Sequence, residues 1–234
     1  MHSLIDTIRG SLCPVHKQGY LFVFIALVVT LILRGFWSPL GWIGLIITLW
    51  IAYFFRDPTR VTPQDVNLVI SPADGKISQV TKALPPRGLD LPEEPMTRIS
   101  IFMNVFDCHV NRSPAAGAIR KILYHKGVFL NAELDKASEE NERMAYLLDT
   151  AGHGPMVFVQ IAGFVARRIV SFVGEGQRLD AGERFGLIRF GSRLDVYLPD
   201  SVDVMVGIGQ RAVAGETVLA SFAEPETGHV FKAS

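Results

Sequence analysis

Two apolar runs separated by a short interruption dominate the first quarter of the chain. The runs extend over residues 20–33 and 40–55, and residues 34–39 between them contain the glycine, serine and proline of a turn. At 1.5 Å per residue each run covers roughly 21–24 Å, which is shorter than the ~30 Å hydrocarbon core of a bilayer. A single helix through both runs would be too long. The pattern therefore predicts an apolar helical hairpin within residues 1–60.

Basic residues flank the hairpin where both of its ends lie. Arg9 and Lys17 precede the first run, and Arg56 and Arg60 follow the second. Because Lys and Arg mark the cytoplasmic flanks of membrane segments, we expect attachment to the cell membrane with the rest of the chain on the cytoplasmic side. A cleaved signal peptide and a buried helical pair are the other interpretations. The second apolar run argues against the former, and the small size of the protein against the latter.

From residue 61 onward the pattern changes to short runs of β-branched and aromatic residues broken by Gly, Pro and Asp. Such runs are typical of strands in a sandwich or barrel. The expected strands lie at residues 69–70, 75–80, 97–105, 118–125, 155–162, 168–173, 185–190 and 194–198. Residues 84–95, with their prolines, are expected to form a surface loop, and residues 131–141 a loop or a short helix.

A repeated pattern of strands and glycine turns near the C-terminus refines this fold class. Residues 204–220 read as a strand, a glycine turn, and an Ala-Gly-Glu turn back into a strand, and residues 179–188 repeat the second half of this pattern. The pattern is similar to that of lipoyl and biotinyl domains. We therefore predict a mainly β protein, with a barrel-sandwich domain of lipoyl-like hairpin units at residues 61–234.

Composition and charge exclude several classes of protein. The chain has 23 basic and 23 acidic residues and no basic patch, so a nucleic-acid partner is not expected. The histidines show no metal-ligand spacing, so no metal is expected. Cys13 and Cys108 lie far apart, which argues against a disulfide framework and fits a reducing compartment.

Gly191 and Ser192 stand between two strand-like runs, 43 residues from the C-terminus. Most Gly-Ser pairs are only turns. However, the carbonyl of Gly191 is unshielded by a side chain, and glycine tolerates the strained backbone that an N-to-O acyl shift to the Ser192 hydroxyl requires. Elimination from the resulting ester leaves dehydroalanine, which hydrolyses to a pyruvoyl group and ammonia. Such a group can form a Schiff base with an amine and act as an electron sink.

At this point the chain resembles the short form of the phosphatidylserine decarboxylase family. The resemblance covers nearly the whole chain and rests on ordered motifs rather than on Gly-Ser alone. The motifs are Phe-Phe-Arg-Asp-Pro at 54–58, Ser-Pro-Ala-Asp-Gly-Lys-Ile at 71–77, residues 99–114 around Asp-Cys-His, Asn-Glu-Arg at 141–143, Gln-Ile-Ala-Gly at 160–163, and residues 185–192 ending in Phe-Gly-Ser.

The resemblance implies a self-cleaving proenzyme. Cleavage between Gly191 and Ser192 would leave a β chain of residues 1–191 and an α chain of residues 192–234, associated as a heterodimer, with Ser192 converted to a covalent pyruvoyl (pyruvate) cofactor. This group would form a Schiff base with phosphatidylserine in the membrane, release CO₂ and give phosphatidylethanolamine. Asp74 matches an acidic residue that orients a histidine base during cleavage, and His109 matches a histidine of the central motif.

One position departs from the pattern of the family. Long-form members carry a second histidine three residues after the first, where this chain has Arg112. Either His109 serves both cleavage and decarboxylation, or another group performs one of them. Taken alone, His109 is more often a hydrogen-bonded structural residue and Asp74 more often a turn aspartate.

Two functions of other classes stay open beside the decarboxylase. The chain could be a non-catalytic membrane adaptor with a lipoyl-like domain, or a pyruvoyl decarboxylase of a soluble amino acid. A homo-oligomer is also compatible with the sequence.

Overall fold

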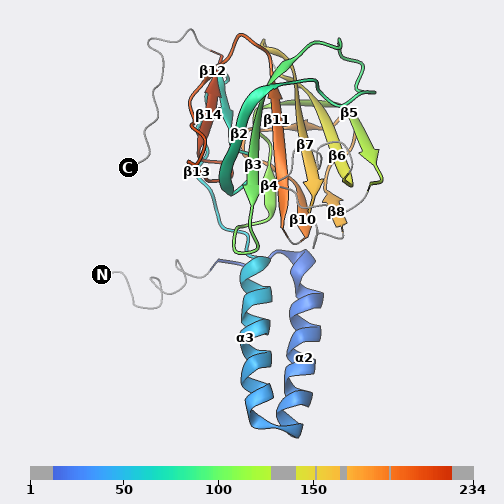
Figure 1. The fold of residues 1–234 in the computed structure, drawn as a ribbon, viewed down its shortest axis with the longest axis vertical. Coiled ribbons are helices and arrows are strands. Elements are labelled where there is room, and N and C mark those ends of the chain that lie inside the picture. Colours follow the sequence, from blue (N-terminus) through green and yellow to red (C-terminus); the bar gives the residue numbers. More distant parts are fainter. Residues whose placement is uncertain (1–12, 128–140, 151, 164–167, 190, 223–234) are drawn as a thin grey trace, which may run out of the picture. The chain divides into compact units, whose positions relative to one another are not determined.

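The computed structural model describes residues 13–127, 141–150, 152–163, 168–189 and 191–222. The chain divides into two compact units, Met1–Thr59 and Arg60–Ser234. The first is helical and the second is built from strands (Figure 1). The prediction of a mainly β fold with an N-terminal apolar helical hairpin is confirmed. Apart from Asn141, the predicted loop or short helix at residues 131–141 lies outside the described residues.

The helical unit is a hairpin of two apolar helices. A 3-10 turn, η1 (Lys17–Gly19), leads into α2 (Tyr20–Phe36), and α3 (Ser38–Phe54) follows after the extended residue Trp37. Pro39 stands in the first turn of α3, where its missing N–H costs no helical hydrogen bond. Arg34, Gly35 and Phe36 extend α2 beyond its predicted apolar run, whereas α3 starts two residues before its predicted run and ends one residue earlier.

Small and hydroxylated residues bring the two helices together. The Thr30 and Thr48 hydroxyl oxygens lie 3.0 Å apart. A Cβ on Gly44 would meet Thr30 Oγ1 at 2.7 Å, so only glycine permits this approach. Each hydroxyl oxygen also lies within hydrogen-bond distance of a carbonyl one turn earlier in its own helix, so one hydroxyl can donate to its carbonyl while the other donates across to it.

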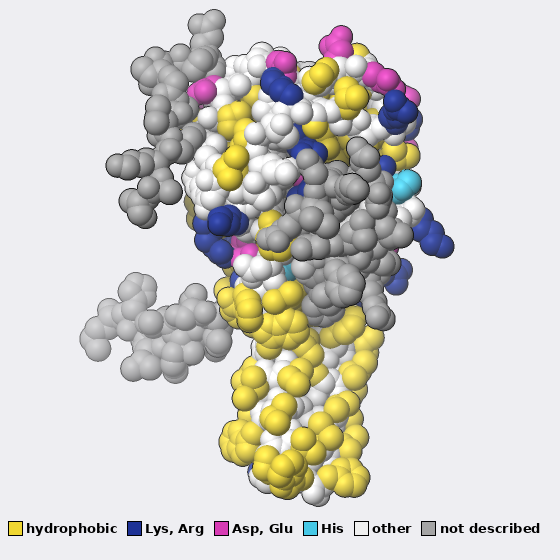
Figure 2. Space-filling view, in the orientation of Figure 1, with side chains coloured by type: hydrophobic (Ala, Val, Ile, Leu, Met, Phe, Trp, Pro, Cys, Tyr) yellow, Lys and Arg dark blue, Asp and Glu magenta, His cyan; other side chains and the backbone are white. Residues whose placement is uncertain are grey.

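The outward faces of the hairpin carry large apolar side chains, seen as the yellow surface over the helices in Figure 2. By length and composition, the helical segment Lys17–Phe36 is able to cross a bilayer, and Ser38–Phe54 is a shorter apolar helix. This surface suggests membrane association of the N-terminal unit.

The second unit contains one large and two small sheets. Its eight-stranded sheet has the order β13-β2-β3-β11-β7-β6-β5-β9, and the three-stranded sheets have the orders β1-β14-β12 and β4-β10-β8. The strands are β1 (Leu68–Ile70), β2 (Gly75–Ala83), β3 (Met96–Met103), β4 (Val110–Arg112), β5 (Gly117–His125), β6 (Arg143–Thr150), β7 (Gly154–Ala162), β8 (Arg168–Ser171), β9 (Arg178–Leu179), β10 (Arg184–Arg189), β11 (Ser192–Leu198), β12 (Asp203–Val204), β13 (Arg211–Ala212) and β14 (Val218–Ser221).

The β unit consists of two similar halves. Residues 71–75 (Ser-Pro-Ala-Asp-Gly) and 113–117 (Ser-Pro-Ala-Ala-Gly) occupy corresponding places and bond to each other's flanks. The Ile70 N–H donates to the Pro114 carbonyl at 2.7 Å, and the Arg112 N–H donates to the Pro72 carbonyl at 2.9 Å. The halves meet at β7 and β11, the two central strands of the large sheet (Figure 1).

The predicted lipoyl-like hairpin units are the corresponding turns of these halves. Gly182 and Gly215 have φ angles of +78° and +79°, which glycine adopts without strain. Their N–H groups donate to the carbonyls of Ser113 and Ser71, respectively. Each turn is thereby tied to the Ser-Pro-Ala motif of one half.

All eight predicted strands are present, with ends shifted by a few residues. Residues 84–95 join β2 to β3 without a strand, as expected, although Leu89 is buried. The strand β6 was not expected, because its Met-Ala-Tyr-Leu-Leu sequence favours a helix. Pairing with β5 and β7 on both sides overrides that preference.

A candidate self-cleavage site

Gly191 lies where the chain passes from one sheet to another. The strand β10 before it belongs to a small sheet, and β11 after it belongs to the large one. Gly191 has a φ of +62°. The nearest atom to a Cβ built on it would be Val105 Cγ1, at an ordinary contact distance of 3.9 Å. Glycine is therefore required here by backbone conformation rather than by lack of space.

Ser192 is the first residue of β11 and is completely buried. Met103 of β3 is its partner on one side and Ala162 of β7 on the other. Its hydroxyl is 3.9 Å from the Met103 sulfur, a weak acceptor. The hydroxyl is thus held within the protein, close to the peptide bond that precedes it.

Both peptide groups of Gly191 are hydrogen bonded. The Gly191 carbonyl, which belongs to the Gly191–Ser192 bond, accepts from the Gly163 N–H at 3.1 Å. The Gly191 N–H donates to His109 Nε2 at 3.3 Å. The structure therefore brings together three of the four predicted site residues: Gly191, Ser192 and His109.

Hydrogen bonding assigns the tautomer of the buried His109 imidazole. Its Nδ1 lies 3.0 Å from the Asp107 carbonyl oxygen, which only an N–H can satisfy. Its Nε2 accepts from Gly191 and so carries the lone pair. An imidazole in this form can take up a proton at Nε2.

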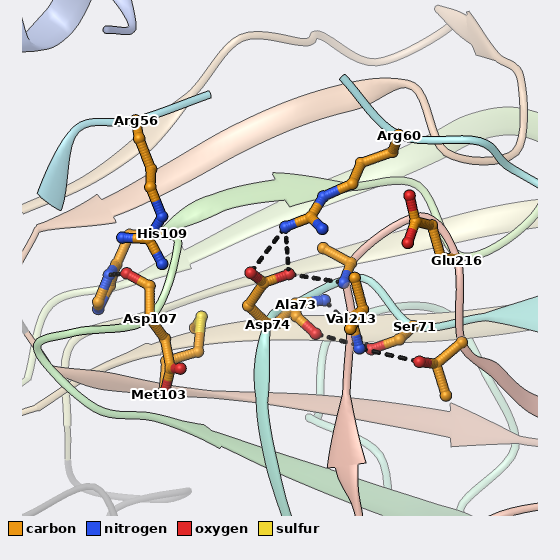
Figure 3. Close-up of polar contacts among 12 residues, drawn as sticks. Arg56, Arg60, Ser71, Ala73, Asp74, Met103, Asp107, His109, Val213 and Glu216 are labelled. Carbon is orange, nitrogen blue, oxygen red and sulfur yellow. Dashed lines mark hydrogen bonds and ion pairs between the residues drawn. The ribbon is translucent and has the colours of Figure 1, made fainter. Parts of the chain in front are cut away.

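The loop before His109 is organised by side-chain contacts. Asn104 Oδ1 accepts from the Phe106 N–H at 2.8 Å, and Asp107 Oδ2 accepts from the Asn104 N–H at 2.9 Å. Asp107 also forms an ion pair with Arg211, a residue of the predicted α chain. Figure 3 shows His109 beside Asp107. These contacts fix the direction in which the loop presents the imidazole.

Asp74 lies at the same end of the large sheet as Ser192. Lys76, two residues later, aligns with Phe102 of β3, which in turn aligns with Arg193 of β11. Two strand spacings therefore separate Asp74 from Ser192, which amounts to roughly 10 Å.

The described bonds of the Asp74 carboxylate go to Arg60 and Ala214. Arg60 Nη2 lies 3.0 and 2.7 Å from its two oxygens (Figure 3). The Ala214 N–H donates to Oδ1 at 2.8 Å. The expected role of Asp74 in orienting a histidine base stays a prediction.

Arg112, at the position of the second histidine of long forms, is buried. Its Nη1 donates to the Gly182 carbonyl at 2.9 Å, in one of the two corresponding hairpin turns. Through this contact Arg112 stabilises the turn at Gly182.

A chain of buried polar groups runs beneath Ser192. The Tyr146 hydroxyl donates to Gln160 Oε1 at 2.9 Å, and Gln160 Nε2 donates to Asn111 Oδ1 at 2.8 Å. Asn111 Nδ2 lies 3.6 Å from the Met103 sulfur, which also faces the Ser192 hydroxyl. Burial raises the pKa of Tyr146 well above its ordinary value, so the phenol stays protonated and donates.

These neighbours of Ser192 are not among the site residues predicted from the sequence. Asn111 and Gln160 belong to the family motifs, so their polarity at otherwise apolar strand positions could have identified them. Met103 and Tyr146 look like ordinary core residues. The N–H of Gly163 acts from the backbone, and no residue type reveals such a contact in advance.

Other parts of the described chain offer less to catalysis. Among the described residues, no group of three or more His, Cys, Asp or Glu side chains could hold a metal ion. A cavity of about 710 Å³ is lined by Arg98, Tyr124 and Tyr197 among others, but by none of the four predicted site residues.

The model of the family described as phosphatidylserine decarboxylase matches residues 47–220. This range covers about three quarters of the chain and includes Asp74, His109, Gly191 and Ser192.

Proposed function

Because the chain belongs to the phosphatidylserine decarboxylase family, we propose that it converts phosphatidylserine to phosphatidylethanolamine with a pyruvoyl group made from its own Ser192. Membership confirms the resemblance in the sequence and makes the protein a carboxy-lyase. Self-cleavage, the pyruvoyl group and the lipid product are the finer parts of the proposal.

The observation that carries the proposal is the geometry at Gly191. Gly191 has a left-handed backbone, its carbonyl accepts from the Gly163 N–H, and its own N–H donates to His109. These features lie at the Gly191–Ser192 peptide bond, next to the buried Ser192 hydroxyl. A turn glycine with only a structural role would need the φ angle but not a histidine on its N–H. The arrangement supports a peptide bond prepared for attack by its neighbour.

Self-cleavage begins when Ser192 Oγ attacks the Gly191 carbonyl carbon and its proton passes to a base. The C–N bond then breaks, the nitrogen of Ser192 takes up a proton, and an ester remains. Loss of the Ser192 α proton with departure of the Gly191 carboxylate leaves dehydroalanine. One water molecule then hydrolyses the dehydroalanine, which releases ammonia and leaves the pyruvoyl group. His109 is the candidate for these proton transfers because its Nε2 carries a lone pair beside Gly191.

The surroundings of Ser192 fit the product of this reaction. Residue 192 would become the N-terminus of the α chain while remaining paired with β3 and β7 in a dry interior. The pyruvoyl group supplies an electrophilic carbonyl that receives the electron pair left behind by CO₂. Burial of residue 192 keeps bulk water from the reacting centre, apart from the one water molecule that processing consumes.

The apolar hairpin gives the enzyme access to its lipid. We place it in the cell membrane with the β unit on the cytoplasmic side, since the basic residues flank both ends of the hairpin. A tethered enzyme meets a lipid headgroup at a high effective concentration.

The test is the fate of the purified chain. Wild-type protein should separate on a denaturing gel into two fragments, the smaller being residues 192–234 with a blocked N-terminus. The Ser192→Ala variant should stay a single chain and release no CO₂, because it lacks the attacking hydroxyl. Wild-type protein should release CO₂ from phosphatidylserine vesicles and not from free serine. An uncut chain that is fully active would contradict the proposal.

A further inference from the structure

One peptide group of the neighbouring strand lies against the carbonyl that self-cleavage would attack. The Gly163 N–H, at the end of β7, donates to the Gly191 oxygen at 3.1 Å. This bond lies next to the pair Ser192 and Ala162, at the end of the β7–β11 ladder. The ladder therefore ends with an N–H donor on the carbonyl of the Gly191–Ser192 bond.

A buried side chain holds the other end of the same peptide group. Asn141 Nδ2 donates to the Ala162 carbonyl at 2.7 Å, and this carbonyl belongs to the peptide whose N–H is that of Gly163. Asn141 has no exposed surface. The Ala162 N–H donates to the Glu142 carbonyl at 2.9 Å, which fixes the strand from the same side. A continuous series of hydrogen bonds runs from Asn141 to Gly191.

We propose that this series is the oxyanion-stabilising device of self-cleavage, with the Gly163 N–H as the donor and Asn141 as its positioning residue. The inference rests on the proposed function and adds a role for the Asn-Glu-Arg motif. It concerns processing of the proenzyme rather than decarboxylation.

The chemical step creates a need for such a donor. As Ser192 Oγ bonds to the Gly191 carbon, the carbonyl electron pair moves onto the Gly191 oxygen and makes it an anion. The charge disappears when the C–N bond breaks and the carbonyl forms again. Preorganised N–H donors aimed at a developing anion stabilise it strongly in a buried site. The Gly163 N–H already donates to the unreacted Gly191 oxygen at 3.1 Å, so it is directed at the atom on which the charge develops.

Asn141 acts on the donor through the peptide between them. An amide that donates to the Ala162 oxygen polarises the peptide and makes the Gly163 N–H a stronger donor, by about 10–30% per bond in a low-dielectric interior. It also fixes the orientation of that peptide at the end of the ladder. After cleavage the Gly191 carbonyl is part of a carboxylate and no longer reacts, so the effect of Asn141 should end there.

The experiment measures self-cleavage rates of Asn141→Ala and Asn141→Asp in the full-length proenzyme. Removing a direct oxyanion donor costs about 10²–10³ in rate. One peptide further away, Asn141→Ala should slow cleavage by roughly 10-fold, and Asn141→Asp by more, because a carboxylate would repel the Ala162 oxygen.

Acidification distinguishes this role from a purely structural one. The carboxyl group of the Asn141→Asp variant can donate again once it is protonated. The cleavage rate of this variant relative to wild type should therefore rise several-fold between about pH 8 and pH 5, since burial raises the pKa of such a carboxyl. The relative rate of Asn141→Ala should stay constant.

Controls separate the possible failures. Asn67→Ala, on a half-buried loop residue outside the site, should cleave like wild type. The same substitutions in a Ser192→Ala background report folding through melting temperature without cleavage. Asn141 variants that are folded and cleave at the wild-type rate would overturn the inference alone. An uncut wild type would overturn the proposed function and this inference with it.

Discussion

Gly191 has a left-handed φ of +62°, yet there is room around it for a methyl group. An L-residue in this region loses about 1–2 kcal/mol relative to glycine, and Asn tolerates it better than Ala. Glycine is therefore needed here for a backbone angle that directs its carbonyl to the Gly163 N–H and its N–H to His109 Nε2.

Substitutions at residue 191 test this view. Gly191→Asn should lower the free energy of unfolding less than Gly191→Ala, and both should slow self-cleavage in the same order, because each shifts the backbone away from its native angle. Gly174 has open space and no left-handed φ, so Gly174→Ala is the matched control and should leave both properties near wild type. Melting curves and gel time courses measure these effects. Equal self-cleavage rates of wild type, Gly191→Asn and Gly191→Ala would contradict this explanation.

The hydrogen bonding and the pKa of Tyr146 depend on its burial. Tyr146→Phe should lower the free energy of unfolding by about 1–3 kcal/mol, because Gln160 Oε1 loses its donor in the interior. Burial raises the pKa of Tyr146 in the folded state, so above about pH 10 the unfolded chain loses this proton and the folded chain keeps it. The stability that the phenol contributes must therefore fall as the pH rises above 10.

Denaturant titrations of wild type and Tyr146→Phe between about pH 7 and pH 11 measure this difference. The gap between the two proteins should be constant up to pH 9 and narrow beyond it. Tyr197, whose pKa burial raises to about 12, is present in both and cancels from the comparison. A gap that widens with pH would refute the assignment.

At the scale of elements, β11 begins at the proposed cleavage site and also lies at the centre of the large sheet. It is paired along its length with β3 and β7, and every residue from Ser192 to Leu198 is buried. A cut before Ser192 would leave all these pairings intact. The ion pair of Arg211 with Asp107 also joins the two fragments.

The cut protein should therefore remain one particle. After cleavage, residues 1–191 and 192–234 should migrate together in size-exclusion chromatography in mild detergent and separate only in denaturant, because the interface is the core of the large sheet. Salt at about 1 M should not separate them, since apolar burial dominates over ion pairs there. Release of the small fragment under native conditions would disagree with this arrangement.

At the scale of the whole molecule, the apolar surface is concentrated on the helical hairpin. Ile25, Val29 and Ile46 are 47–66% exposed there. Lysine costs about 2.5–3.5 kcal/mol at the centre of a membrane helix, so three such substitutions oppose insertion far more than thermal energy can offset. The packing between α2 and α3 should survive, because these side chains point away from it.

Flotation with phosphatidylserine vesicles measures the effect. Wild-type protein should float with the vesicles even at high salt, because its attachment is apolar. The triple variant Ile25→Lys, Val29→Lys, Ile46→Lys should remain with the soluble fraction. The matched control places lysine at the exposed Val61, Val66 and Ile208 of the β unit and should float like wild type. Equal flotation of both triple variants would contradict a membrane role for the hairpin.

The sequence by itself determined the features that follow from local pattern. Apolar runs predicted α2 and α3, short runs of β-branched and aromatic residues predicted eight strands, and ordered motifs predicted the family. Each of these depends on residue types that are close together in the chain. The strand β6 escaped prediction because its residues favour a helix and only the neighbouring strands decide otherwise.

Only the tertiary structure decided what surrounds the Gly191–Ser192 bond. His109, Gly163 and Asn141 lie between 28 and 82 positions before Gly191 in the chain, and sheet pairing brings them to it. Two of these contacts involve backbone N–H groups, which every residue except proline has, so no residue pattern could reveal them. The position of the proposed reacting serine is local information in the sequence, whereas the environment that would make it react is set where two sheets meet.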